Sequence, residues 1–221
     1  MSRESVESVE SDVIIVGAGG HGREVAHVLR ARRAAGLPAP TLLGFADDGG
    51  GDADLLRPFG PLLGGVLAAV GEHPEALVIG GVGDGRLRRR LVEHLPAPPA
   101  LVHPLADVGD DVTLGEGTVI CSHVSLTTQI ATGRHVHVSR GAAVGHDAVL
   151  CDFVSIMPLA AVSGGVRLEA GVFVGTGALL RQGIHVGADA VIGMGAVVLD
   201  DVPPGTIVVG NPARVRRPAL G

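Results

Sequence analysis

The second half of the chain carries an aliphatic residue at every sixth position. From Val102 to Val198, sixteen of these seventeen positions are Val, Leu or Ile, and Thr132 is the exception. A second set of positions, four residues after each of these, holds only Val, Ile, Ala and Thr from Val112 onward. Neither a strand nor a helix buries two positions in every six, because their periods differ from this one. The repeat predicts a parallel β-helix.

The composition fits a narrow, regular interior. Only four residues are aromatic, all of them Phe, whereas 35 of the 221 residues are Gly. The net charge of −6 argues against a nucleic-acid partner, because no excess of basic residues is present to neutralise phosphates. We therefore expect an interior filled by Val, Ala, Ile and Leu, and no nucleic acid bound.

Features of the sequence also bear on location. The two cysteines favour a reducing compartment over a disulfide-linked secreted domain. The stretch MSRESVESVESD is polar and acidic, unlike a signal peptide, and no apolar run is long enough to span a membrane. We expect a cytoplasmic protein with no membrane span.

The first half of the chain has a different pattern. Short apolar runs such as VIIVG and ALVIGG each end in glycine and are followed by helix-like segments such as REVAHVLRARR and RLRRRLVEHL. Strands that alternate with helices predict a parallel, Rossmann-like α/β domain. The expected organisation is a disordered N-terminus at 1–12, a Rossmann-like domain at 13–95, a linker at 96–101, a β-helix at 102–209 and a C-terminal tail at 210–221.

A glycine motif follows the first predicted strand. GAGGHG places Gly17, Gly19 and Gly22 in a G-x-G-x-x-G pattern between a strand and a helix. Such a turn favours a phosphate at the helix start, where N–H groups are free and the dipole attracts anions. Asp47 and Asp48, after the next strand, are candidates to bind a ribose or a base. Alone, the motif is typical of an NAD-binding enzyme, but no hydride-transfer site is evident.

The repeat also identifies a family. The hexads VGDDVT, LGEGTV, VGADAV and IGMGAV, with the closing VVGNPARV, resemble the hexapeptide-repeat acyltransferases. Together with GAGGHG, they resemble the bacterial sugar acetyltransferases that modify sialic acids or nucleotide-linked amino sugars. The resemblance implies a left-handed β-helix with three hexads per coil, a homotrimer and acetyl-CoA as the acyl donor, with no metal.

Eighteen-residue coils would place Gly164 over His146 and Gly165 over Asp147. The two glycines would leave a notch beside the imidazole, and a glycine N–H there could stabilise an oxyanion. Histidine suits the task of removing a proton from an attacking amine or hydroxyl. Neighbours on a strand point to opposite faces, so a turn or a subunit contact would have to bring His146 and Asp147 together. The resemblance implies that His146 is the general base and Asp147 its acidic helper.

Other site residues rest on the resemblance. It implies that the nucleotide-sugar contacts Gly19, Gly20 and His21, and that acetyl-CoA contacts Ser155, Gly164, Thr176 and Met194. Thr176 and Met194 are eighteen residues apart and would form one column. Ser155 stands where the family often has a second histidine. His135 and His137 are expected to be exposed or interface residues.

The sequence therefore predicts a sugar acetyltransferase that works by direct transfer in a ternary complex. Whether the acceptor is a hydroxyl of a sialic acid or an amine of a nucleotide-sugar stays open. A non-catalytic trimeric scaffold and an NAD-binding enzyme are the alternatives. A zinc enzyme using His123, His137 and His146 is disfavoured, because the closely spaced histidine pair of such proteins is absent.

Overall fold

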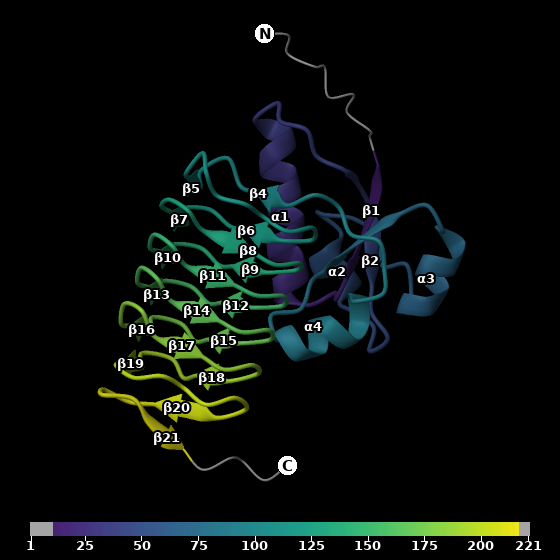
Figure 1. Cartoon of the computed structure of the whole chain (residues 1–221). Helices are drawn as coiled ribbons and strands as arrows, with labels where there is room; N and C mark the ends of the chain where they lie inside the picture. Colours follow the sequence, from purple (N-terminus) through teal and green to yellow (C-terminus); the bar gives the residue numbers. More distant parts are fainter. Residues whose placement is uncertain (1–10, 217–221) are drawn as a thin grey trace, which may run out of the picture.

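The computed structural model describes residues 11–216. An α/β domain lies against one side of a left-handed β-helix (Figure 1). Both predicted fold classes are thus confirmed. The expected disorder at 1–12 falls mostly outside the described residues, and the first strand already begins at Asp12. The end of the chain differs from the expected tail, since 214–216 form a strand that pairs with the last coil.

The N-terminal domain is a three-stranded parallel sheet flanked by helices. Its strand order is β2-β1-β3. The apolar run at 13–16 is wholly buried, because helices cover both faces of such a sheet. The bounds are β1 Asp12–Val16, α1 Gly20–Ala34, β2 Thr41–Ala46, α2 Ala53–Leu56, α3 Val66–Glu72, β3 Leu77–Gly80 and α4 Gly85–Val92.

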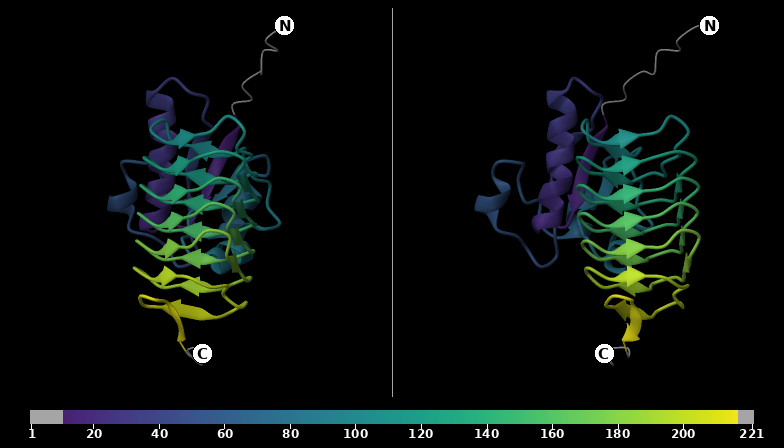
Figure 2. Two further views of the ribbon diagram at one scale, coloured as in Figure 1. Left: turned by 60° about the vertical axis from the view of Figure 1, so that its left-hand side comes forward. Right: turned by 90° about the vertical axis from the view of Figure 1, so that its left-hand side faces the viewer.

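The β-helix has three sheets, and each inner coil contributes one strand to each of them, whereas the first and last coils contribute only isolated bridges, at Thr113 and Val202, to one sheet. Figure 2 shows the coils stacked along one axis. We name the sheets after one strand of each. The β7 sheet contains β5 Asp107–Val108, β7 Ser125–Leu126, β10 Ala143–Val144, β13 Ala161–Val162, β16 Leu179–Leu180 and β19 Val197–Val198. The β8 sheet contains β8 Ala131–Thr132, β11 Val149–Leu150, β14 Arg167–Leu168 and β17 His185–Val186. The β9 sheet contains β4 Leu101–Val102, β6 Val119–Ile120, β9 His137–Val138, β12 Ser155–Ile156, β15 Phe173–Val174, β18 Val191–Ile192, β20 Ile207–Val209 and β21 Arg214–Arg216.

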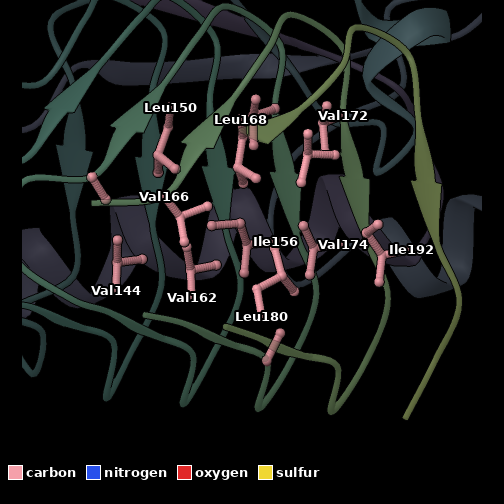
Figure 3. Close-up of a cluster of buried hydrophobic side chains, with 14 of the residues drawn as sticks. Val144, Leu150, Ile156, Val162, Val166, Leu168, Val172, Val174, Leu180 and Ile192 are labelled. Carbon is pink, nitrogen blue, oxygen red and sulfur yellow. The ribbon is translucent and has the colours of Figure 1, made fainter. Parts of the chain in front are cut away.

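Neighbouring coils pair with a shift of eighteen residues. Ala143 pairs with Ala161, and Ser155 pairs with Phe173. The aliphatic column of the repeat points inward and is buried along the axis, as Val144, Val162 and Leu180 show in Figure 3. Burial of these side chains is the main stabilising contribution, since transfer from water contributes about 1.5–3 kcal/mol for each large aliphatic side chain. The predicted register is confirmed.

The coils turn at edges where the backbone adopts a positive φ. Every sixth residue from Gly117 to Gly195 has this conformation. Glycine occupies half of these positions at no steric cost, and Asp147 is among the others, with φ 58°. This unbroken pattern explains why Gly, Asp and polar residues separate the aliphatic positions.

Candidate active site

His146 and Asp147 lie on the edge between the β7 and β8 sheets, in the turn between β10 and β11. The turn at Asp147 brings the two side chains together, so that His146 Nδ1 lies 2.7 Å from Asp147 Oδ2. Their side chains are 54% and 55% exposed. When the carboxylate accepts a hydrogen bond from Nδ1–H, the lone pair of Nε2 is left available to take a proton. The backbone turn thus brings His146 and Asp147 into contact, which a regular strand cannot do because neighbouring side chains on a strand point to opposite faces.

Gly164 lies over His146, as the stacking predicted, and its missing side chain leaves a notch that the imidazole itself occupies. A Cβ atom at this position would lie 2.5 Å from His146 Nε2, which is closer than real Cβ contacts allow. The imidazole therefore occupies space that any side chain at 164 would need. The Gly164 N–H makes no backbone hydrogen bond within residues 11–216, whereas the Gly165 N–H donates to the His146 carbonyl. The Gly164 N–H, a hydrogen-bond donor, thus lies beside the His146 imidazole, the candidate base.

Thr176 and Met194 form one column, as expected, but on another edge. They follow β15 and β18 and lie between the β9 and β7 sheets, one coil apart. Met194 is 82% exposed although it is apolar. Within one chain, the structure does not bring this column beside His146 and Gly164.

Ser155 is a correction to the expected acetyl-CoA contacts. It is 0% exposed. Its hydroxyl accepts a hydrogen bond from Arg88 Nη2 at 3.0 Å, because the N-terminal domain covers this part of the β9 sheet. In this structure the hydroxyl is out of reach of a ligand.

His135 and His137, which were expected to be exposed or interface residues, are not exposed. Their exposed fractions are 0% and 2%. His135 stacks on Phe153, and His137 contacts His21 of the glycine loop. Both lie where the α/β domain covers the β-helix, so they are contact residues between two parts of one chain.

Arg88 is a residue that sequence patterns did not single out, since it lies in the basic run RLRRR of α4. Its guanidinium is fully buried and donates across the domain boundary. Burial lowers its pKa to about 9, and Asp84 partly offsets this effect. The acceptors are the carbonyls of Val82, Gly83, His135, Phe153 and Val154 and the Ser155 hydroxyl.

The glycine loop divides into packing positions and open positions. A Cβ at Gly17 would lie 2.8 Å from the Gly81 carbonyl oxygen, and one at Gly22 would lie 2.0 Å from that of Gly17. At Gly19 a Cβ would meet nothing within 4 Å. Gly19 is also the N-cap residue of α1, so no side chain caps the first N–H groups of this helix. The backbone around Gly19 and Gly20 is thus the part of the motif that is open to a ligand.

Asp47 and Asp48 shape the loops beside this motif. Asp47 Oδ2 accepts a hydrogen bond from the Ala18 N–H at 2.8 Å, and Asp48 Oδ1 accepts one from Val66 N–H at 2.9 Å, at the start of α3. Each carboxylate has further lone pairs, so a ribose or base contact stays a prediction.

A family model and several curated proteins each match a part of the chain. Residues 12–95 match the family model of the PglD N-terminal domain. A GDP-perosamine N-acetyltransferase of Escherichia coli O157:H7 is 31% identical over 142 residues, which cover 60% of this chain and 64% of that protein. A tetrahydropyridine-dicarboxylate N-acetyltransferase of Staphylococcus aureus is 36% identical over 88 residues, or 40% of this chain and 33% of that protein. The matches thus span less than two thirds of these curated relatives.

Solved structures match over nearly the whole length. A histidine-to-asparagine mutant of perosamine N-acetyltransferase from Caulobacter crescentus, in complex with CoA and GDP-perosamine, has a TM-score of 0.80 and 31% identity and covers 93% of this chain and 97% of that one. The chain belongs to the hexapeptide-repeat sugar acetyltransferases. Another structure, the acetyltransferase domain of PglB from Neisseria gonorrhoeae with acetyl coenzyme A, has a TM-score of 0.83 and 32% identity, with 94% and 100% covered.

Two further observations describe this sugar acetyltransferase. None of the helices in residues 11–216 is both long and apolar enough to cross a membrane. Within the same residues, no three His, Cys, Asp or Glu side chains are grouped so that they could hold a metal ion.

The buried histidines predict that this acetyltransferase loses stability in mild acid. Burial, with a smaller contribution from nearby Arg88, lowers the pKa of His21 from 6.5 to about 4. Burial also lowers the pKa of His135 to about 4, with Arg134 and Arg88 adding to the effect and Asp152 opposing it. The unfolded chain binds protons below its own histidine pKa while the folded chain does not, so stability present above pH 6.5 is lost as the pH falls toward 4.

The expected loss is about 3 kcal/mol for each of the two histidines over this whole interval. Urea unfolding between pH 7 and pH 4.5 measures it. An unfolding free energy that stays constant over this interval would show that the histidines titrate normally.

Proposed function

We propose that the protein transfers the acetyl group of acetyl-CoA to an amine of a nucleotide-linked sugar, with His146 as the general base. The observation that carries the proposal is the geometry of one imidazole. His146 Nδ1 is held by Asp147 while Nε2 faces the notch at Gly164. An amine is favoured over a hydroxyl because the relatives named above are N-acetyltransferases.

The reaction needs only proton transfer and charge stabilisation from the protein. The acceptor nitrogen attacks the thioester carbonyl, and His146 Nε2 takes the proton that the nitrogen loses. The Gly164 N–H is placed to donate to the oxygen on which negative charge develops. Collapse of the intermediate expels the CoA thiolate, which takes up the proton held by His146. No covalent bond to the protein forms.

The acceptor's nucleotide is assigned to the α/β domain. The open backbone at Gly19 and Gly20, at the start of the 15-residue helix α1, offers N–H groups to a diphosphate. His21 is the next residue in the chain, and Asp47, which accepts a hydrogen bond from the Ala18 N–H, and its neighbour Asp48 are assigned to the ribose or the base. The perosamine N-acetyltransferase solved with GDP-perosamine supports a nucleotide-sugar as the acceptor.

A homotrimer is part of the proposal. The column of Thr176 and Met194 lies on a different edge from His146, so a neighbouring copy would have to supply it to the acetyl-CoA groove. From β7 to β19, the β7 sheet between the two edges presents small or apolar residues outward, among them Ala143, Ala161 and the exposed Leu179, and Asp107 of β5 is the charged residue in this outward column. The uncharged part of this face suits contact with a second copy. Light scattering is expected to give three chain masses.

A cytoplasmic location is also proposed. Cys121 and Cys151 are both free thiols, which a reducing compartment preserves.

Release of CoA tests the proposed function. The protein is mixed with acetyl-CoA and, separately, with GDP-, UDP- and dTDP-linked amino sugars, the corresponding free amino sugars, and a sialic acid. Turnover with a nucleotide-linked amino sugar but not with its free sugar is expected. Turnover with the sialic acid alone would overturn the choice of acceptor. Failure with every acceptor would favour a scaffold that does not catalyse.

Filling the notch gives a second prediction. Gly164→Ala is expected to lower kcat by about 10- to 100-fold, because the new Cβ displaces the imidazole by a distance that matters for proton transfer. Gly164 has an ordinary φ, so the fold should not be strained. The effect acts through His146, so the double variant Gly164→Ala/His146→Ala should be no slower than His146→Ala alone. Full additivity of the two losses would contradict this account.

A further inference from the structure

A pair of buried histidines joins the glycine loop to the β-helix. His21 is the second residue of α1, and His137 lies on β9. The distance from His21 Nε2 to His137 Nδ1 is 2.6 Å, and the ring centroids are 4.9 Å apart with nearly parallel planes. One hydrogen bond therefore links the loop that we assign to the nucleotide with the body of the β-helix.

The second nitrogen of each ring has a different environment. His137 Nε2 is buried and has no hydrogen-bond partner within the described chain. Its neighbours on the adjacent strands are Val119, which has no polar side-chain atom, and Ser155, whose hydroxyl is engaged with Arg88. His21 Nδ1, in contrast, lies 3.7 Å from Glu24 Oε2 and faces the loop at Gly83, on the partly exposed side of the ring.

Both rings are neutral in this environment. Burial lowers the pKa of His137 well below its usual value, and Arg88 and His21 add to the effect. Burial and Arg88 likewise lower the pKa of His21 to about 4. A single proton therefore lies between His21 Nε2 and His137 Nδ1, and it belongs to one ring or the other.

The two arrangements differ in what they leave unpaired. If His21 donated, His137 would carry its own proton on Nε2, as a buried donor with no acceptor. The bare Nδ1 lone pair of His21 would then face the Glu24 carboxylate. If His137 donates from Nδ1, its Nε2 is only a vacant acceptor, and His21 turns an N–H toward that carboxylate. Orphaned buried N–H groups are rarer than orphaned acceptors, so both comparisons favour donation by His137.

We infer that His137 is a positioning residue that holds His21 as the Nδ1–H tautomer, so that the imidazole presents a neutral N–H donor beside the open N–H groups of Gly19 and Gly20. The N–H groups of Gly19, Gly20 and His21 suit the oxygens of a nucleoside diphosphate, and a bound diphosphate would replace the Glu24 carboxylate, 3.7 Å from His21 Nδ1, as the group that this N–H faces. The inference about the tautomer stands on the 2.6 Å contact, the unpartnered His137 Nε2 and the burial that keeps both rings neutral, whereas its use in substrate binding rests on the proposed function.

Two variants of His137 separate the hydrogen bond from packing. His137→Phe keeps a flat ring in the buried site but has no nitrogen. His137→Asn carries an amide nitrogen two bonds beyond Cβ, as His carries Nδ1, and can donate to His21 Nε2. Histidine ring ¹⁵N–¹H correlation spectra report the tautomer, with the His21 signals assigned by their loss in His21→Ala. Steady-state kinetics with the best nucleotide-linked amino sugar report KM and kcat separately.

The wild-type protein is expected to show His21 protonated on Nδ1. His137→Phe should lose this tautomer and raise KM for the nucleotide-sugar about tenfold with little change in kcat, and His137→Asn should restore both properties to within about threefold. A wild-type His21 protonated on Nε2 would overturn the inference, as would a folded His137→Phe protein with unchanged tautomer and KM. If no nucleotide-sugar binds to the wild type, the role in binding falls with the proposed function, while the spectra still decide the tautomer.

Discussion

Replacing His146 with Ala is expected to lower kcat/KM by about 10²- to 10⁴-fold, the range that a positioned general base contributes. The side chain is largely exposed and contacts Asp147, so its removal leaves the core of the β-helix intact. The loss should therefore lie in the chemical step and not in folding. Initial rates with acetyl-CoA and the best acceptor, together with circular dichroism and direct binding of CoA, measure both.

His185→Ala is the matched control. His185 is also a half-exposed histidine of the β-helix, on β17, and its contact with Glu169 is a surface ion pair worth little. Its removal should leave kcat/KM within about twofold of the wild-type value, because an exposed pair of this kind contributes little to stability. Equal activity of the two variants would remove His146 from the proposed mechanism.

Replacing Arg88 with Met is expected to destabilise the protein by about 3 kcal/mol or more, because several buried acceptors then lose their donor and each can cost about 1–3 kcal/mol. The acceptors come from the loop after β3 and from the β-helix, so the variant should also loosen the contact between the two parts of the chain. Gly80 makes room for this side chain, since a Cβ there would lie 2.5 Å from Arg88 Cγ. Urea unfolding and hydrogen exchange across 81–85 test both effects.

Arg90→Met, on the same helix, supplies the comparison for Arg88. Arg90 is more accessible than Arg88 and makes no side-chain hydrogen bond within residues 11–216, so its replacement should change the unfolding free energy by no more than about 0.5 kcal/mol. Arg88→Lys should fall between the two, because an ammonium group donates to fewer of the fixed acceptors than a guanidinium does. An Arg88→Met protein as stable as the wild type would show that water replaces the guanidinium without cost.

The repeat was predictable in detail because its physics is local. Each coil buries the same two positions against the coils on either side of it, so a period of six read along the sequence becomes a column in space. The period, together with the three hexads per coil that the family resemblance implies, therefore predicts that Gly164 lies over His146. The contact between His146 and Asp147 was harder to predict from the sequence. It depends on the positive φ of Asp147, which follows from the position of this residue on an edge of the β-helix.

The residues whose surroundings differ from the expectation, one predicted site residue and two histidines, lie where the two parts of the chain meet. Ser155, His135 and His137 face outward from the β-helix, and the repeat alone indicates that such positions are exposed. The α/β domain covers them, and Arg88 binds to this surface from a run of arginines that is typical of a solvated helix face.

The sequence by itself determined the two folds, the coil register and the position of the imidazole beside a missing side chain, because each depends on periodicity or on neighbours along the chain. Only the tertiary structure decided which outward faces are covered, that a buried guanidinium joins the two parts, and that His21 is paired with His137. These contacts join residues 47 and 116 positions apart. No local pattern encodes such a pairing, because its free energy arises only when both surfaces lose their water together.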